Sequence, residues 1–208
     1  DENLFRVRVN LGTASLGAND DPANGADVVV MDDFLFGEPQ ALKNEVLKRG
    51  DKKKVKGSAA PNKIKGSKEN DVLIGGGSYD VLIGKAGKDK LIGVDPKDAM
   101  PGLWEKDTYR GGRDRDKLIL GTKKGYYYDD GDTALGGYND YAKILGLKEE
   151  DVIQLHGDRS EYNLMEMEMN GKQGIGIYLT EGQSVEELIG FAKGASVELV
   201  DSTLKFKG

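Results

Sequence analysis

Cysteine is absent from the 208 residues of the chain. Its absence excludes disulfide bonds, thiolate zinc sites and cysteine nucleophiles. The chain also lacks a run of eighteen apolar residues, so we expect no segment that spans a membrane. Proline is scarce with 5 residues, whereas glycine is abundant with 30, about twice its average usage. A glycine excess without a proline excess indicates many tight turns rather than a collagen-like or disordered chain.

Histidine is also scarce: the chain contains one, His156, in the segment "VIQLHG". The sequence has no HExxH zinc motif and no G-x-S-x-G nucleophile motif that could act with this residue. Composition alone leaves a pair of glycosidase carboxylates open, but the aspartates of the chain follow a different pattern. We therefore expect a protein that is not an enzyme, with His156 in an ordinary turn position.

A nine-residue repeat is the strongest pattern in the sequence. Its first column is glycine, at Gly57, Gly66, Gly75, Gly84, Gly93, Gly102 and Gly111. Its sixth column is acidic or amide, at Asn62, Asp71, Asp80, Asp89, Asp98, Asp107 and Asp116. Its eighth column is apolar, at Ile64, Leu73, Leu82, Leu91, Met100, Tyr109 and Leu118. Seven successive glycine matches have chance odds of roughly one in a million, so the period reports a repeated structural unit.

Each unit combines a short strand around the eighth column with a glycine-rich turn. Two units complete one flattened coil, and successive coils stack about 4.8 Å apart as parallel strands. The sequence therefore predicts an all-β protein built on a parallel β-roll, a short β-solenoid, at residues 51–125. We expect an N-terminal strand and helix cap at residues 1–50 and a β-rich flanking region with an antiparallel hairpin at residues 126–208.

The stacked turns bring the sixth column together at the two edges of the roll. A period of eighteen residues gathers Asn62, Asp80, Asp98 and Asp116 on one edge and Asp71, Asp89 and Asp107 on the other. Carboxylates that repeat every ~5 Å repel one another unless a cation lies between them. Carboxylate and carbonyl oxygens suit Ca²⁺ better than Mg²⁺. We expect Ca²⁺ ligands among Asp71, Asp80, Asp89, Asp98, Asp107 and Asp116, together with the carbonyls of Gly75, Gly77, Gly84 and Gly87.

Residues 93–108 interrupt the repeat. Pro96 takes the fourth column of its unit, where glycine is expected, and Pro101 spoils a regular strand. One interpretation is an inserted loop, and it makes Asp98 and Asp107 the weakest ligands. Because Gly93 and Gly111 are separated by one full coil, we expect the register to survive in either case.

The repeats resemble a known family. "GGGSYDVLI" and "GGRDRDKLI" are similar to the G-G-x-G-x-D-x-U-x nonapeptide of the RTX, or haemolysin-type, calcium-binding proteins, and residues 126–157 resemble the segment that follows the β-roll in such proteins. The resemblance implies folding that depends on Ca²⁺ and a secreted, extracellular location. The lumen of a compartment is the alternative location. The acidic segment "DDGDTALGGYND", residues 129–140, could hold one more ion.

Positive charge is concentrated in the first half of the roll. Residues 48–92 contain twelve Lys or Arg and five Asp or Glu, a net charge of +7 in a chain whose formal charge is −6. One interpretation is a solvated face that protects a strand edge. The other is docking to an acidic protein, lipid or polysaccharide surface. The candidate docking residues are Lys52, Lys53, Lys54 and Lys56. No aromatic residues interleave with them, which argues against nucleic acid.

These observations leave two functional classes. The first is a calcium-binding β-roll whose folding or stability is gated by Ca²⁺. The second is a degenerate β-solenoid that acts as a structural or docking subunit of a larger assembly, with the metal incidental.

The flanks carry local signals. Alternation predicts a strand in "LFRVRVNL", residues 4–11, and a second strand is expected in "ADVVVMDDFLF". "EPQALKNEVLKRG", residues 38–50, predicts the capping helix. Asn170-Gly171 predicts a type I′ turn between two strands, with Met165, Met167 and Met169 in the core. "QSVEELIGFAKG" is ambiguous, because a capping box indicates a helix and the family resemblance indicates a strand.

Overall fold

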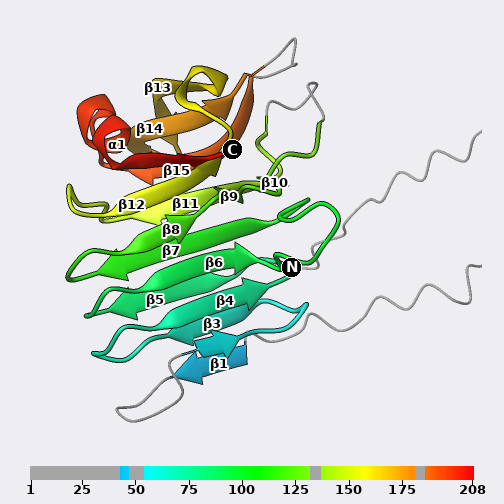
Figure 1. Ribbon diagram of the computed structural model, residues 1–208, viewed down its shortest axis with the longest axis vertical. Helices are drawn as coiled ribbons and strands as arrows, with labels where there is room; N and C mark the ends of the chain where they lie inside the picture. The colour runs from blue at the N-terminus through cyan, green and yellow to red at the C-terminus, as the bar shows by residue number, and fades with distance from the viewer. Residues whose placement is uncertain (1–42, 47–53, 132–136, 181–185) are drawn as a thin grey trace, which may run out of the picture. The chain divides into compact units, whose positions relative to one another are not determined.

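The computed structural model describes residues 43–46, 54–131, 137–180 and 186–208 (Figure 1). The chain divides into two units, residues 1–38 and 39–208, and the described residues all belong to the second. The strands expected at residues 4–11 and 26–36 lie outside the described residues. The predicted boundaries near residues 50 and 125 stay predictions.

Two sheets form the layers of the second unit. The first follows the order β1-β3-β5-β7-β11-β15-β14-β13 and the second the order β16-β12-β8-β6-β4-β2. The strands of the first sheet are β1 (Lys43–Val46), β3 (Asn62–Lys65), β5 (Val81–Lys85), β7 (Lys106–Gly112), β11 (Tyr141–Leu145), β13 (Tyr162–Met169), β14 (Lys172–Leu179) and β15 (Glu187–Lys193). The strands of the second sheet are β2 (Lys54–Lys56), β4 (Val72–Gly76), β6 (Lys90–Val94), β8 (Lys117–Ile119), β12 (Val152–His156) and β16 (Leu204–Lys207). The remaining elements are the antiparallel pair β9 (Gly121–Thr122) and β10 (Gly125–Tyr126), the 3₁₀ turn η1 (Arg159–Glu161) and helix α1 (Val197–Thr203).

The predicted parallel β-roll is confirmed. Successive units alternate between the two sheets, and strands eighteen residues apart pair in parallel, so that Ile64 lies beside Leu82 and Leu73 beside Leu91. Leu73, Leu82 and Leu91 are fully buried, and Leu118 is 1% exposed. The eighth column is therefore the apolar interior between the sheets, as the repeat predicts.

The inserted loop is confirmed, but the expectation that the register survives it is wrong. Residues 95–105 leave the roll between β6 and β7, and the pairing then continues with an offset of 27 residues, as in Leu82 beside Tyr109 and Leu91 beside Leu118. One nine-residue unit is half a coil, so its extrusion moves every later unit to the opposite sheet. Met100, predicted to be interior, is 50% exposed.

The prediction of a capping helix at residues 38–50 is also wrong for residues 43–46, the part of this segment that the structure describes. Residues 43–46 form strand β1, which pairs in parallel with β3. The open edge of the first sheet offers unpaired N–H and C=O groups to a neighbouring segment. This pairing outweighs the local helix signal, which is only a weak preference.

The region after the roll continues both sheets. β13 and β14 form the predicted hairpin around Asn170 and Gly171, which have φ values of 51° and 69°. The methionine prediction is only partly right: Met169 is buried and Met167 packs beside it, but Met165 is 40% exposed because β13 is the last strand of its sheet. The ambiguous segment forms strand β15 rather than a helix.

Candidate metal centre

Two ladders of acidic side chains run along the turns of the roll. On the first edge, the backbone N–H of Asn62 donates to Asp80 Oδ1 at 2.7 Å, and that of Asp80 donates to Asp107 Oδ1 at 2.8 Å. On the second edge, three such bonds of 2.8 to 2.9 Å run from Asp71 to Asp89, from Asp89 to Asp116 and from Asp116 to Asp151. Each carboxylate therefore links its own coil to the preceding one.

The membership of the ladders differs from the sequence prediction. Asp107 lies on the edge of Asp80 and Asp116 on the edge of Asp89, each opposite to its predicted edge. Asp98 lies in the insertion, is exposed and belongs to neither ladder. The cause is the half-coil extrusion, which exchanges the two edges for every unit that follows it.

In each ladder hydrogen bond the aspartate uses Oδ1, and several of the remaining Oδ2 atoms have no hydrogen-bond partner. Oδ2 of Asp80, Asp89 and Asp116 is buried without a hydrogen-bond partner, and these residues are only 1 to 2% exposed. By contrast, Asp71 Oδ2 accepts from the backbone and hydroxyl of Ser67, and Asp107 Oδ2 accepts from the Tyr128 hydroxyl at 2.6 Å. No ion pair within the described residues involves a ladder aspartate. A buried acceptor without a partner is costly, so these oxygens call for a cation or a proton.

The electrostatics agree with this geometry. Burial, reinforced by the charge of Asp107, raises the pKa of Asp80 from 3.8 to about 8. Burial likewise raises the pKa of Asp89 and of Asp107 to about 7 and that of Asp116 to about 6. An ionised carboxylate in such surroundings is unfavourable unless positive charge lies beside it.

The first-column glycines explain how oxygens converge in the turns. A Cβ atom on Gly75 would lie 2.2 Å from Asp80 Oδ2 and 2.2 Å from the carbonyl oxygen of Gly93. A Cβ atom on Gly84 would lie 2.2 Å from Asp89 Oδ2 and 2.5 Å from the carbonyl oxygen of Gly111. Backbones of successive coils thus approach so closely that only glycine fits, and a carboxylate and a carbonyl oxygen face the same Cα. This all-oxygen donor set fits Ca²⁺.

The other predicted glycines hold different positions. Gly87 has a φ of 97°, and Gly77 lies in the third column, where a Cβ atom would make ordinary contacts. Ser78 and Asp114 stand in the fourth column with φ values of 75° and 70°. Each non-glycine residue in this left-handed conformation costs roughly 1–2 kcal/mol, so the turns are held in place by the stack rather than by local preference.

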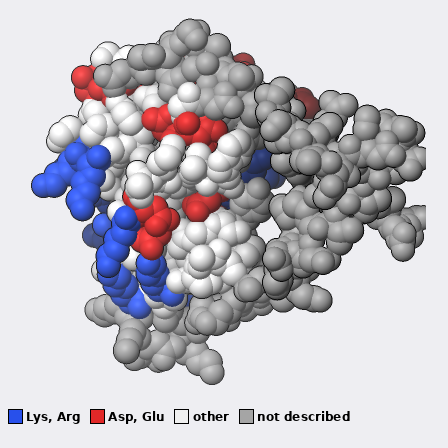
Figure 2. All heavy atoms as spheres, turned by 90° about the vertical axis from the view of Figure 1, so that its right-hand side faces the viewer, with Lys and Arg blue, Asp and Glu red and all other residues white. Residues whose placement is uncertain are grey.

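The predicted docking lysines are only partly described. Lys52 and Lys53 lie outside the described residues. Lys54 and Lys56 belong to β2, and Lys56 Nζ pairs with Asp95 Oδ2 at 2.6 Å, at the base of the insertion. Figure 2 faces the edge of the roll that carries the insertion, and acidic side chains gather near the middle of this view, with most of the visible Lys and Arg side chains on its left.

One ladder position and one neighbour were missed at the sequence level. Asp151 extends the second edge, and the segment "DVIQL" at 151–155 repeats the pattern of "DVLIG" at 71–75, which could have revealed it. Glu105 is 8% exposed, accepts from the backbone of Ser78 through Oε1 and leaves Oε2 without a partner. Burial raises its pKa to about 8. Its fourth-column position gave no signal, because glycine is expected there.

His156 has a structural role. Its Nδ1 lies 2.6 Å from the carbonyl oxygen of Thr122, and since a carbonyl only accepts, Nδ1 carries the proton. The ring of Tyr126 packs edge-on against the imidazole at 4.5 Å between centroids. Both contacts hold the β9–β10 pair against the end of β12.

A stack of parallel coils with carboxylate ladders and glycine turns defines the class of the fold as a β-roll of nonapeptide repeats. Residues 57–93 match the RTX calcium-binding nonapeptide repeat in four copies. This stretch contains β3, β4, β5, most of β6 and the ladder residues Asp71, Asp80 and Asp89. A comparison with curated proteins gives no match for the chain. Within the described residues, no helix has the length and apolar character needed to cross a membrane.

Proposed function

We propose that the protein is a non-catalytic calcium-binding β-roll whose folding and stability are gated by Ca²⁺. One observation carries the proposal: Oδ2 of Asp80, Asp89 and Asp116 is fully buried and has no hydrogen-bond partner. The match of residues 57–93 to a calcium-binding repeat supports the same assignment.

The residues that would hold the ions follow from the contacts of the turns. On the second edge, Asp89 and Asp116 would act with the carbonyl group of Gly111, which faces the same Cα as Asp89 Oδ2. On the first edge, Asp80 would act with Glu105 and the carbonyl of Gly93. Bound Ca²⁺ supplies the positive charge that these buried carboxylates lack. The ladder hydrogen bonds keep Oδ1 of Asp80, Asp89 and Asp116 on the preceding coil, which leaves Oδ2 of these three residues for the ion.

Gating by Ca²⁺ follows from mass action. An ion that binds only the stacked coils stabilises the folded state in proportion to the logarithm of its concentration. Without it, ionised aspartates repel one another along each ladder. We propose a secreted protein, because extracellular calcium modules are tuned to dissociation constants of about 10⁻⁴–10⁻³ M, which the cytosol does not supply.

The test is a calcium titration of wild type, Asp89→Asn and Asp98→Asn, with heat measured by calorimetry and unfolding followed by circular dichroism. We expect the wild-type melting temperature to rise with Ca²⁺ and fall with a chelator. Asp89→Asn should bind fewer ions, whereas Asp98→Asn should match wild type, because Asp98 lies exposed in the insertion. Unchanged melting on chelation, together with no heat of binding, would reject the proposal.

A second candidate function is docking to an anionic surface, either as well as calcium binding or as the main role in a larger assembly. A groove of about 530 Å³ lies on the outer face of β6, β8, β12 and β16. Asp89 and Asp116 of the second ladder line it together with the basic residues Lys88, Lys90, Arg115, Lys117, Lys205 and Lys207. Burial and these like charges lower the pKa of Lys117. Like charges paired across a sheet, as in Lys90 beside Lys117, destabilise it unless an anion binds.

Dextran sulfate is a suitable probe of this basic groove, with neutral dextran as its control. The double variant Lys90→Ala and Lys117→Ala should bind it more weakly than wild type, and binding should weaken as salt rises, because a Debye length of ~10 Å at 0.1 M screens exposed charges. Lys172→Ala, on the exposed start of β14, is the matched control. Equal binding by the double variant would remove this candidate.

A further inference from the structure

The structure contains a second group of carboxylates outside the nonapeptide repeats. Asp130, Asp140 and Glu187 each place one carboxylate oxygen within 4.8 Å of the others. We propose that these three residues, the post-roll carboxylate cluster, bind a divalent cation, with Ca²⁺ as the ion that their chemistry favours. This site does not depend on the assignment of Ca²⁺ to the roll.

The cluster joins three segments that are distant in the sequence. Asp130 lies on the segment that follows β10, Asp140 directly precedes β11, and Glu187 begins β15. β11 and β15 are paired in parallel, which brings Asp140 and Glu187 to the same end of the first sheet. The backbone N–H of Asp130 donates to Glu187 Oε1 at 2.8 Å and fixes the segment against β15.

Asp140 supplies the independent observation that points to a ligand. It is fully buried, and its Oδ1 has no hydrogen-bond partner, while Oδ2 accepts only a 3.4 Å contact from the backbone of Trp104. The charge of Lys106 acts on Asp140, but Lys106 lies over the Tyr141 ring at 5.7 Å and forms no ion pair with Asp140 among the described residues. Asp140 therefore places a buried carboxylate oxygen among other carboxylates, and no positively charged group is bonded to that oxygen.

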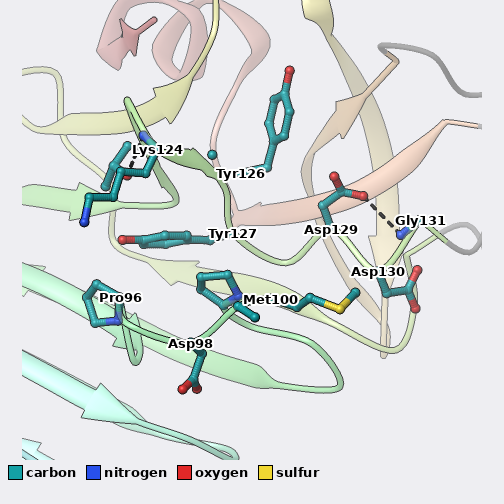
Figure 3. A pocket seen from close by; sticks show the side chains of 13 residues that line it. Pro96, Asp98, Met100, Lys124, Tyr126, Tyr127, Asp129, Asp130 and Gly131 are labelled. Atoms are coloured by element: carbon teal, nitrogen blue, oxygen red, sulfur yellow. Dashed lines mark hydrogen bonds between the residues drawn. The ribbon is translucent and has the colours of Figure 1, made fainter.

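The donors select the kind of ion. All three are oxygen ligands, which excludes a preference for soft metals. Three carboxylates from three segments, two of them buried, suit the flexible coordination of Ca²⁺, whereas Mg²⁺ usually keeps several waters and takes one or two carboxylates. Asp129 adds negative charge beside Glu187. Figure 3 shows Asp129, Asp130 and Gly131 at one end of a cavity of about 450 Å³, with the Asp130 carboxylate directed away from Asp98 and Pro96.

A bound ion would fasten the end of the roll to the sheet that follows it. Glu105 directly precedes β7, and its backbone carbonyl accepts a hydrogen bond from the N–H of Tyr141 at 3.1 Å, so Asp140 lies next to the last coil. The cluster therefore connects the segment after β10 with the start of β11 and with β15. The contact between Trp104 and Asp140 connects the same site to the insertion. Closing three segments onto β11 gives the ion a stabilising role separate from the ladders.

The test compares wild type with Asp140→Asn, Asp130→Asn and the control Glu166→Gln, using CaCl₂ as the probe and a chelator for the metal-free state. Glu166 is an exposed carboxylate on β13 of the same sheet. Asp130 is only half-buried, so its variant keeps the experiment valid if Asp140→Asn fails to fold. Calorimetry should show about one ion fewer per chain for Asp140→Asn and Asp130→Asn and no change for Glu166→Gln.

Melting temperatures separate a ligand from a structural carboxylate. With saturating Ca²⁺, Asp140→Asn should melt below wild type. In chelator it should melt at the same temperature or higher, because it removes a buried, repelled charge. An equal change in both conditions, or unchanged stoichiometry in the cluster variants, overturns the proposal. Loss of an ion in Asp89→Asn with none lost in Asp140→Asn would leave the calcium-binding roll standing and reject only this site.

Discussion

The close approach of successive coils makes a specific prediction for Gly84→Ala. The new Cβ atom would lie 2.5 Å from the carbonyl oxygen of Gly111, a backbone atom that cannot rotate away, and 2.2 Å from Asp89 Oδ2. Ordinary contacts begin near 3.4 Å, so the two coils must separate by close to 1 Å. Overpacking of this kind costs about 1–3 kcal/mol. Weakening the ladder bond between Asp89 and Asp116 adds about 1 kcal/mol.

Gly77→Ala is the matched control for this substitution. Gly77 also lies in a turn of the roll, has no left-handed φ, and its Cβ atom would come no closer than 3.4 Å to any atom. It should be neutral or stabilise the protein by about 0.4–1 kcal/mol through the unfolded state. Urea unfolding followed by circular dichroism, in chelator and again with saturating Ca²⁺, measures both variants. Equal free energies of unfolding for Gly84→Ala and Gly77→Ala would refute the close stacking of the coils.

Two further predictions concern the interior and the ladders. Leu82→Ala should lower the free energy of unfolding by about 2–5 kcal/mol, because Leu82 is fully buried between the sheets; urea unfolding measures it, and a loss below about 1 kcal/mol would contradict a packed core. The metal-free protein should lose stability as pH rises from 4 to 8, because the pKa values of Asp80 and Asp89 are raised from 3.8 to about 8 and about 7 in the folded state. The contribution is fully present below the unfolded pKa and is lost as pH rises through the folded pKa values; melting scans that show rising stability over this range would contradict it.

Local patterns predicted the parts of the fold that depend on short-range chemistry. The eighth column identified Leu73, Leu82 and Leu91 as interior because a strand between two sheets has an obligatory inward side chain. Asn170-Gly171 identified the hairpin because its two positive φ values need these residues. The helix expected at residues 38–50 failed at residues 43–46, since the open edge of a sheet overrides weak helix preference.

The candidate site was predicted in kind but not in arrangement. Sequence spacing identified Asp71, Asp80 and Asp89, whose register has no interruption. It placed Asp107 and Asp116 on the wrong edges, because spacing measures length along the chain and cannot tell a stacked unit from an extruded one. The post-roll carboxylate cluster depends on Glu187, which is 47 residues from Asp140, and no local pattern connects residues at that distance.

The sequence by itself determined the repeating unit of this protein. At a period of nine, a β-roll places every glycine in a turn, every aspartate at an edge and every apolar residue in the interior. It also predicted the class of ion, since oxygen ligands are the donors that the period supplies. Only the tertiary structure decided which coil follows which. Extruding residues 95–105 exchanges the edges at the cost of one loop, and the pairing of β7 with β5 at an offset of 27 residues shows that the chain takes this arrangement.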